Sequence, residues 1–131
     1  MNKDIPNFEV DLTEVFDKSV KHFVKKKKYT KLPEQLEELI EELENGHFTG
    51  DILTQNINPK YSLYKKRIPN KDTKSGVSNG YRVIYIVAYD KRAVGLLDIY
   101  YKKEDETLTE RYIQGLVDGF LMLLLYGDSE E

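Results

Sequence analysis

The residues of this chain best suited to chemistry are four basic side chains, spread over three segments that each read as a β-strand. They are Lys65, Arg67, Arg82 and Lys103. Guanidinium and ammonium groups that converge on one surface bind phosphate oxygens and stabilise negative charge that builds on them. Seven basic residues against one acid give residues 60–82 a net charge of +6, whereas the whole chain carries −3. The pattern therefore predicts a site for a phosphate-rich ligand.

The segments that carry these residues are expected to be consecutive strands. Their bounds are Tyr61–Ile68, Gly80–Asp90 and Val94–Lys103. Side chains alternate between the two faces of a strand, so Lys65 and Arg67 share one face of the first. Arg82 starts a strand that is apolar on both faces, which is typical of a covered central strand. The same alternation groups four residues of the third strand: Leu97, Ile99, Tyr101 and Lys103.

Two arrangements fit these alternations. If the registers align, Lys65, Arg67, Arg82 and Lys103 form one phosphate-facing patch. The other arrangement is a solvated sheet face that is held by aromatic cross-strand pairs.

The segment before the strands reads as two helices. A capping box of Asp11 and Glu14 opens the first helix, which runs to about Lys27. Pro33 suits the first turn of the second helix, and Asn45-Gly46 ends it. The short link between them predicts an antiparallel helical hairpin.

The remaining elements complete the expected architecture. A short strand near Phe8–Val10 precedes the helices, and a last helix begins at Thr107 with an apolar stripe through Leu124. Residues Pro69–Asn79 are polar and rich in turn formers, so they predict a long mobile hairpin loop. The order β-α-α-β-β-β-α predicts one α+β domain over residues 1–131: an N-terminal helical hairpin packed on a small antiparallel β-sheet, with a C-terminal helix.

Composition narrows the chemistry further. The chain has no cysteine, which excludes disulfides and thiolate catalysis. His22 and His47 are isolated in the sequence and read as solvated side chains, so neither a metal nor a cofactor is predicted. The start lacks an apolar signal core, and the apolar run Phe120–Tyr126 is far shorter than the roughly 20 residues that span a bilayer. We therefore expect a cytoplasmic protein without a membrane partner.

The charges outside the strands are arranged in blocks. Residues 18–31 carry seven lysines and no acid, residues 32–44 carry six glutamates and no base, and residues 104–131 carry eight acids and one arginine. Solvated helix faces and a polar tail explain these blocks. Alternatively, the lysines between Lys18 and Lys31 extend the phosphate-binding surface. Since the sequence does not show where they point, they are not included in the predicted site.

Three motifs together resemble a known family. The motifs are YKKRI, GYRVIY and LLDIYYKKE, which start at Tyr64, Gly80 and Leu96. They resemble the core of the RelE/ParE toxin superfamily, particularly its RelE-type ribosome-dependent mRNA interferases, over about Phe8–Lys103. The resemblance implies a toxin of a type II toxin–antitoxin system, masked by a cognate antitoxin protein. It also implies a free toxin that enters the ribosomal decoding site and cuts the mRNA there.

The resemblance assigns roles to individual residues. Lys65 and Arg67 match the basic strand residues of the RelE type, and Arg82 matches the arginine of its G-Y-R segment. Lys103 stands where the family has a second catalytic arginine, so the charge is kept but the bidentate fork is lost. The family's aromatic or histidine general acid/base has no counterpart at Thr107–Thr109. Two tyrosines are candidate substitutes: Tyr101 and Tyr112.

The expected reaction is a metal-independent cleavage of RNA. Arg67 and Arg82 would stabilise charge on the phosphate oxygens, and Lys65, crowded by other cations, would accept the proton of the 2′-hydroxyl. A tyrosine would stack a splayed base. The predicted substrate-binding residues are Lys66, Tyr101 and Lys102.

A second hypothesis keeps the fold without the catalysis. In that hypothesis the chain is a RelE/ParE-fold binding protein, such as a ParE-like DNA gyrase inhibitor. Part of Leu121–Tyr126 is expected to be exposed, and such a surface suits an antitoxin or a second copy of the chain that forms a homodimer through the C-terminal helix.

Overall fold

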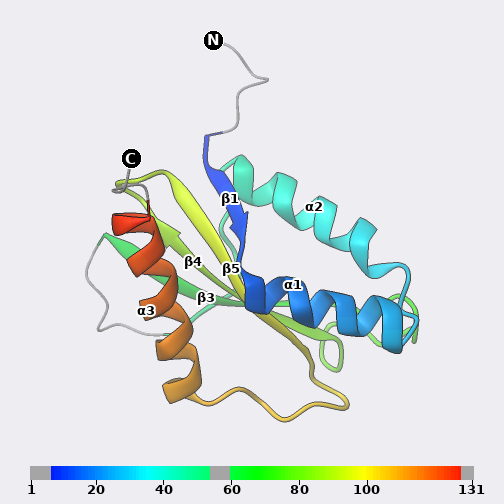
Figure 1. Ribbon diagram of the computed structural model, residues 1–131. Coiled ribbons are helices and arrows are strands. Elements are labelled where there is room, and N and C mark those ends of the chain that lie inside the picture. Colours follow the sequence, from blue (N-terminus) through cyan, green and yellow to red (C-terminus); the bar gives the residue numbers. More distant parts are fainter. Residues whose placement is uncertain (1–6, 54–59, 128–131) are drawn as a thin grey trace.

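The computed structural model describes residues 7–53 and 60–127, which form a five-stranded sheet with helices on both of its faces (Figure 1). The last acidic residues of the chain, from 128 on, lie outside the described residues. The elements in chain order are β1 (Glu9–Leu12), α1 (Glu14–Lys21), the π-helical turn η1 (His22–Lys26), α2 (Leu32–Glu44), β2 (Asp51–Ile52), β3 (Tyr61–Ile68), β4 (Tyr81–Ala88), β5 (Ala93–Tyr101) and α3 (Glu110–Tyr126).

The sheet is mixed rather than antiparallel throughout. Its strand order is β1-β5-β4-β3-β2, and β2 to β5 pair antiparallel with their neighbours. β1 pairs parallel with β5, with Glu9 opposite Ala93. The expectation of an antiparallel sheet is therefore wrong at β1. A parallel pair requires a long crossover, and the helices and strands between β1 and β5 supply it.

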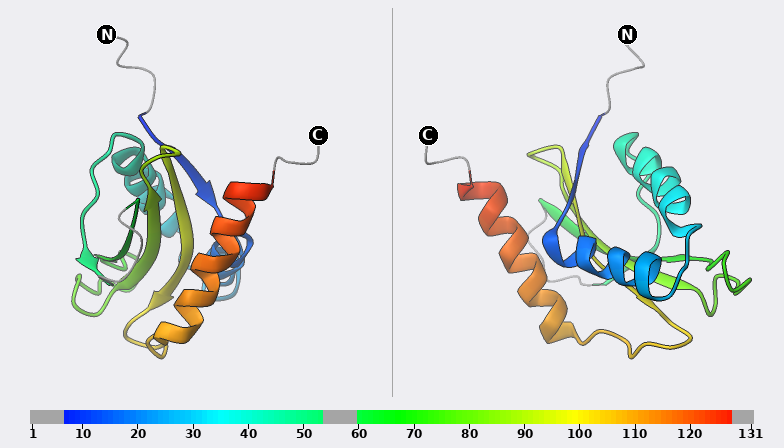
Figure 2. Two further views of the ribbon diagram at one scale, coloured as in Figure 1. Left: turned by 90° about the vertical axis from the view of Figure 1, so that its left-hand side faces the viewer. Right: turned by 45° about the vertical axis from the view of Figure 1, so that its right-hand side comes forward.

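β4 is the centre of the molecule, because every one of its eight residues is buried. α1, η1 and α2 cover one face of the sheet, and α3 covers the other (Figure 2). The core on the side of α1 and α2 includes Phe16, Leu36, Leu39, Tyr64, Val83, Tyr85, Val87 and Leu96. The core on the side of α3 consists of Leu63, Ile84, Ile86, Leu97, Tyr100, Ile113, Val117 and Phe120.

The two N-terminal helices do not form the expected hairpin. α1 packs on β5, whereas α2 packs on β1 and η1, so the two helices diverge from their connection (Figure 1). Each helix buries its own apolar residues over the sheet, Phe16 from α1 and Leu36 from α2. Burial on the sheet thus replaces burial of one helix against the other.

An irregularity in β5 changes which residues share a face. Ile84 of β4 lies opposite Asp98, but the next residue, Tyr85, lies opposite Leu96, so Leu97 is an extra residue in β5. Leu97 accordingly packs with α3, whereas Ile99 and Tyr101 pack with the N-terminal helices. The predicted grouping of Leu97 with Ile99 and Tyr101 is wrong, since a bulge reverses the alternation of side chains.

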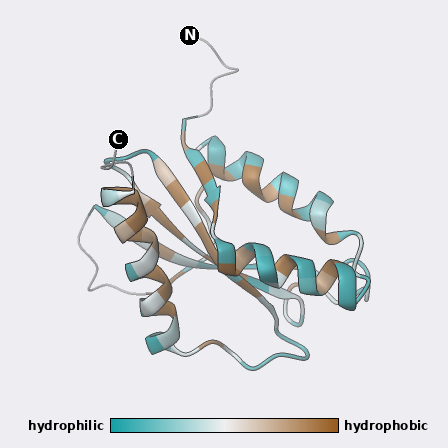
Figure 3. Cartoon of the chain, in the orientation of Figure 1, coloured by the Kyte–Doolittle hydropathy of each residue, from teal (hydrophilic) through white to brown (hydrophobic). Residues whose placement is uncertain are grey.

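Hydrophobic residues are frequent in the strands and in α3, whereas α1 is largely hydrophilic (Figure 3). The outer side of α3 keeps several large apolar residues in solvent, as the sequence predicted for part of this stretch. Met122, Leu123 and Tyr126 are 61%, 69% and 62% exposed. Among residues 7–53 and 60–127, no helix has both the length and the apolar character needed to cross a membrane.

Gly95 tests how closely α3 packs on the sheet. A methyl group on Gly95 would lie 2.6 Å from the Phe120 ring, so Gly95→Ala should lower the free energy of unfolding by about 1–3 kcal/mol. Gly115→Ala is the control, because nothing lies within 4 Å of a methyl group there. It should raise the free energy of unfolding by about 1 kcal/mol, the difference in helix propensity. Urea denaturation measures both, and equal stability of Gly95→Ala and the wild type would contradict this packing of α3.

Candidate functional site

Three of the predicted basic residues share one face of the sheet, which we call the cationic face: Lys65, Arg67 and Arg82. Arg67 lies directly opposite Arg82 across β3 and β4, and Lys65 lies opposite Ile84. Ile84 packs with α3, so the cationic face is on the α3 side of the sheet. On the other side of Arg82, the register places Tyr100 of β5. The cross-strand row Arg67–Arg82–Tyr100 therefore forms the centre of the site.

The buried guanidinium of Arg82 binds backbone carbonyls of its own chain. It is 5% exposed, and its guanidinium donates hydrogen bonds to the carbonyl oxygens of Val77 (2.9 Å), Ser78 (2.9 Å) and Tyr81 (3.2 Å). Burial and the neighbouring Arg67 guanidinium lower the pKa of Arg82 from its ordinary value. The side chain thus holds the end of the β3–β4 loop against the start of β4, and few of its five N–H donors remain for a ligand.

Arg67 is the accessible guanidinium of the site. Its side chain is 55% exposed, and one of its amino groups lies 3.4 Å from the carboxylate of Asp51. Asp51 is the register partner of Lys65 on the edge strand β2, so a carboxylate lies among the basic residues. Asp51 is not recognisable as a site residue from the sequence, because a strand of two residues leaves no alternating pattern to detect. A carboxylate in this position is a candidate proton acceptor.

Three of the predicted lysines do not join the cationic face. β5 ends at Tyr101, so Lys102 and Lys103 lie in the exposed turn after it, and strand alternation does not align them with Arg82. Lys66 points to the opposite face, where its ammonium donates a hydrogen bond of 2.5 Å to the Thr49 hydroxyl. The predicted alignment of Lys103 with the other three basic residues is therefore wrong.

Tyr101 does not offer its ring to a ligand. It is 1% exposed on the side of the N-terminal helices, and its hydroxyl lies 2.9 Å from both the Thr73 and the Ser75 hydroxyls. Its ring packs edge-on against Tyr29, with centroids 5.8 Å apart. Tyr101, a predicted substrate-binding residue, is buried in this structure and connects the β3–β4 loop to the turn before α2. Together with the hydrogen bonds of Arg82, these contacts hold the loop that was expected to be mobile.

Tyr112, the other candidate acid, lies at the start of α3. Its hydroxyl donates to Asp98 at 3.3 Å, and burial and the negative charge of Asp98 raise the pKa of Tyr112. Asp98 also accepts hydrogen bonds from the Ser19 hydroxyl (2.6 Å) and the Ile99 amide (2.8 Å). Burial raises the pKa of Asp98, although these hydrogen bonds oppose the change.

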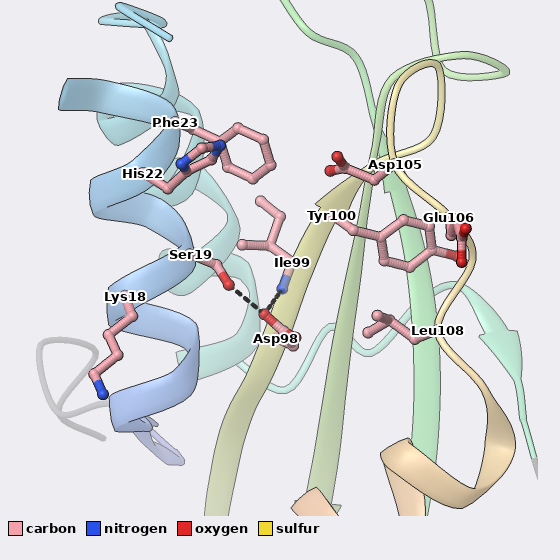
Figure 4. A pocket seen from close by; sticks show the side chains of 10 residues that line it. All are labelled: Lys18, Ser19, His22, Phe23, Asp98, Ile99, Tyr100, Asp105, Glu106 and Leu108. Carbon is pink, nitrogen blue, oxygen red and sulfur yellow. Dashed lines mark hydrogen bonds between the residues drawn. The ribbon is translucent and has the colours of Figure 1, made fainter. Parts of the chain in front are cut away.

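A cavity of about 340 Å³ opens beside Asp98, between α1 and the segment that leads to α3 (Figure 4). Three carboxylates contribute to its lining, from Asp98, Asp105 and Glu106. The excess of carboxylates makes it a poor site for a phosphate. Within the part of the chain that the structure describes, no group of three or more histidine, aspartate or glutamate side chains is placed to hold a metal ion.

Comparisons with known proteins find similarity among solved structures. No family model and no curated protein matches the sequence. The chain is similar to a solved chain from the archaeal RelE–RelB complex of Pyrococcus horikoshii OT3, with 14% identity and a TM-score of 0.47. The match covers 76% of this chain and 99% of that chain. Neither the identity nor the TM-score carries the role of a residue over to this chain.

The environment of Arg82 predicts that its removal affects stability. Arg82→Ala leaves the carbonyls of Val77 and Ser78 without their donors, so the free energy of unfolding should fall by about 1–3 kcal/mol. Arg67→Ala removes only a solvent-exposed ion pair and should change it by about 0.5 kcal/mol or less. Urea denaturation of the two variants checks the contrast. Equal losses would contradict the bracing role of Arg82.

The environment of Asp98 predicts a pH-dependent stability. Because its pKa in the folded protein lies above the ordinary value of 3.8, ionisation destabilises the folded state as the pH rises through the raised pKa. Asp98→Asn retains acceptors for Ser19 and Ile99 and cannot ionise. The free energy of unfolding of Asp98→Asn should therefore increase relative to that of the wild type as the pH rises above 3.8. Denaturation at a series of pH values measures the difference, with the exposed Asp118→Asn as control. A difference that does not vary with pH would contradict the burial of a titrating carboxyl at Asp98.

Proposed function

We propose that this chain is a toxin of a type II toxin–antitoxin system, and that it cleaves mRNA at the ribosomal decoding site without a metal. The observation that carries the proposal is the cationic face: Arg67 lies opposite Arg82, and Lys65 lies beside them on the same side of the sheet. The YKKRI and GYRVIY motifs that resemble the RelE type contribute these same residues. Since ribosomes are the proposed target, the proposed location is the cytoplasm.

The proposed reaction uses the RNA's own nucleophile. The 2′-hydroxyl oxygen forms a bond with the adjacent phosphorus, and the bond from phosphorus to the 5′-oxygen breaks. The proton of the 2′-hydroxyl passes to a base on the protein, and the departing 5′-oxygen takes up a proton. The products are a 2′,3′-cyclic phosphate and a 5′-hydroxyl. Arg67, with its exposed fork, would stabilise the charge on the phosphate oxygens, and buried Arg82 would add its positive charge.

The proton transfers have new candidates. Asp51 lies beside both Lys65 and Arg67, so either Lys65 or Asp51 can accept the proton of the 2′-hydroxyl. Tyr112 stays the candidate proton donor, although burial and the negative charge of Asp98 raise its pKa and so make it a weaker acid than an ordinary tyrosine. Lys103 has no place on the cationic face and is not included in this chemistry.

The proposed antitoxin requires a surface, and α3 offers one. Its outer side exposes Met122, Leu123, Leu125 and Tyr126, and apolar patches of this kind mark interaction sites. An antitoxin segment that covers them would bury large apolar side chains that otherwise remain in water. A second copy of the chain on α3, as a homodimer, is the competing occupant.

One observation favours the second candidate function, a binding protein such as a ParE-like DNA gyrase inhibitor. The guanidinium of Arg82 is buried and bonded to the carbonyls of its own loop. A buried arginine that is bonded in this way stabilises the fold and adds positive charge to a binding surface, but it does not contact a phosphate directly.

Induction of the protein in cells separates the two candidates. The wild type should produce mRNA fragments that start with a 5′-hydroxyl at regular codon positions, detected by mapping ends that can be ligated only after phosphorylation. Arg67→Ala should reduce this cleavage by about 10²–10³-fold, the typical effect of losing one group that stabilises developing charge. Lys91→Ala, at the far end of the sheet, should cleave as the wild type does. Arg67 is preferred to Arg82 for this test because its loss leaves the loop braced.

The same assay identifies the proton acceptor. The variants to compare are Lys65→Gln and Asp51→Asn. The substitution that removes the proton acceptor should abolish cleavage, and the other variant should retain most of the cleavage. Growth arrest with intact mRNA and altered DNA supercoiling would overturn the nuclease in favour of the gyrase inhibitor.

A further inference from the structure

Lysines from three distant parts of the chain gather at one end of the molecule, which we call the cationic end. They lie in η1 and the turn after it, in the β3–β4 loop, and in the turn after β5. All nine are exposed: Lys25, Lys26, Lys27, Lys28, Lys31, Lys71, Lys74, Lys102 and Lys103. Figure 1 shows these segments together on the right-hand side of the molecule, and the right-hand view of Figure 2 agrees.

Specific contacts hold the three segments together. Lys27 forms an ion pair of 2.9 Å with Glu104, which joins the turn after η1 to the turn after β5. The amide of Lys31 donates to the Asp72 carboxylate at 3.0 Å, which joins the turn before α2 to the β3–β4 loop. The buried Tyr101 contacts both sides through its ring and its hydroxyl. The gathering of lysines is thus part of the folded structure.

The acids in these segments do not balance the lysines. Asp72, Glu104, Asp105 and Glu106 are the acids within residues 22–31, 69–79 and 102–106, so nine lysines face four acids. Asp72 accepts the Lys31 amide, and Asp105 accepts the Tyr101 amide at 2.8 Å. The net charge of about +5 contrasts with −3 for the whole chain. Like charges held together in a fold cost stability, so an external anion is favoured there.

Two of these lysines also occupy strained backbone positions. Lys28 has a φ of 64° and Lys74 a φ of 61°, in the left-handed region where glycine is the unstrained residue. A side chain in this region costs roughly 1 kcal/mol. Glycine would stabilise both turns and remove two positive charges.

We propose that the cationic end binds the sugar–phosphate backbone of RNA next to the cationic face. Lys102 follows β5 directly, and its amide bonds to the carbonyl of Gly80, two residues before Arg82. A backbone held by the cationic end therefore continues toward the row Arg67–Arg82–Tyr100. The choice of RNA as the polyanion rests on the proposed function. The existence of the cationic end is a feature of the structure and does not depend on that function.

The chemistry favours a nucleic acid over a membrane. Lysine ammonium groups bind phosphates as point charges and need no base sequence. Membrane-surface binding combines basic residues with apolar ones that enter the bilayer. In these segments, Val77 is the one large apolar residue that is exposed among the described residues. The strongly exposed apolar side chains Met122, Leu123 and Tyr126 belong to α3 instead.

The test measures binding without cleavage, using the full chain and a 2′-O-methylated RNA, which lacks the nucleophile. Fluorescence anisotropy over a range of salt concentrations gives the slope of log K against log salt, which falls by about 1 for each lost phosphate contact. Two double variants should each reduce the magnitude of this slope by about 2. They are Lys102→Gln/Lys103→Gln and Lys28→Gly/Lys74→Gly. The second pair should also unfold at a higher urea concentration than the wild type, because it relieves two strained positions. The control pair is Lys60→Gln/Lys91→Gln, at the opposite end of the sheet.

The outcomes separate this inference from the proposed function. An unchanged slope in both cationic-end variants, or an equal loss in the control pair, would overturn the cationic end as the binding surface. Stronger binding to vesicles of equal parts phosphatidylglycerol and phosphatidylcholine than to RNA would overturn the choice of ligand, as would stronger binding to a DNA duplex. Binding to RNA that depends on the cationic end in a chain that cuts no mRNA would support this inference and overturn the nuclease.

Discussion

The structure depends on the burial of β4 on both of its faces. A strand whose eight residues are all buried needs a layer on each side, and α1 with α2 on one side and α3 on the other provide them. The strand carries one charge, Arg82, and a buried charge is tolerated only when it is well solvated by the protein. The carbonyls of Val77 and Ser78 provide that solvation. The burial that builds the core therefore also fixes the loop beside the site.

Tyr101 extends this constraint to the opposite face of the sheet. Its hydroxyl bonds to Thr73 and Ser75, and its ring meets Tyr29, so one buried side chain connects β5, the β3–β4 loop and the turn before α2. A tyrosine suspected of stacking on RNA instead organises the segments that carry the lysines. In the proposed function, Tyr101 would contribute to RNA binding through the position of the cationic end.

Local sequence patterns predicted the positions of the strands well, but they predicted less well how the strands pair in the sheet. β3 has the predicted bounds, and the alternation of side chains placed Lys65, Arg67 and Arg82 on one face. The bulge at Leu97 was not predictable, because an inserted residue leaves no mark in an apolar strand. The parallel pairing of β1 and the short β2 depend on contacts between distant segments. Asp51 could not be assigned to the site for that reason, and Lys102 and Lys103 were assigned to a strand that ends before them.

The different chemistries of lysine and arginine give the two charged surfaces different tasks in the proposed function. Lysine is a mobile point charge that attracts phosphate without fixing its orientation, whereas the planar fork of arginine fixes two oxygens at once. The cationic end consists of lysines on three connected segments, as a surface that holds a backbone of any sequence requires. The cationic face offers one exposed fork, from Arg67, next to the carboxylate of Asp51. If the proposed function is correct, a lysine at position 103 would hold the RNA backbone from the turn after β5, and the orientation of the reacting phosphate would depend on Arg67.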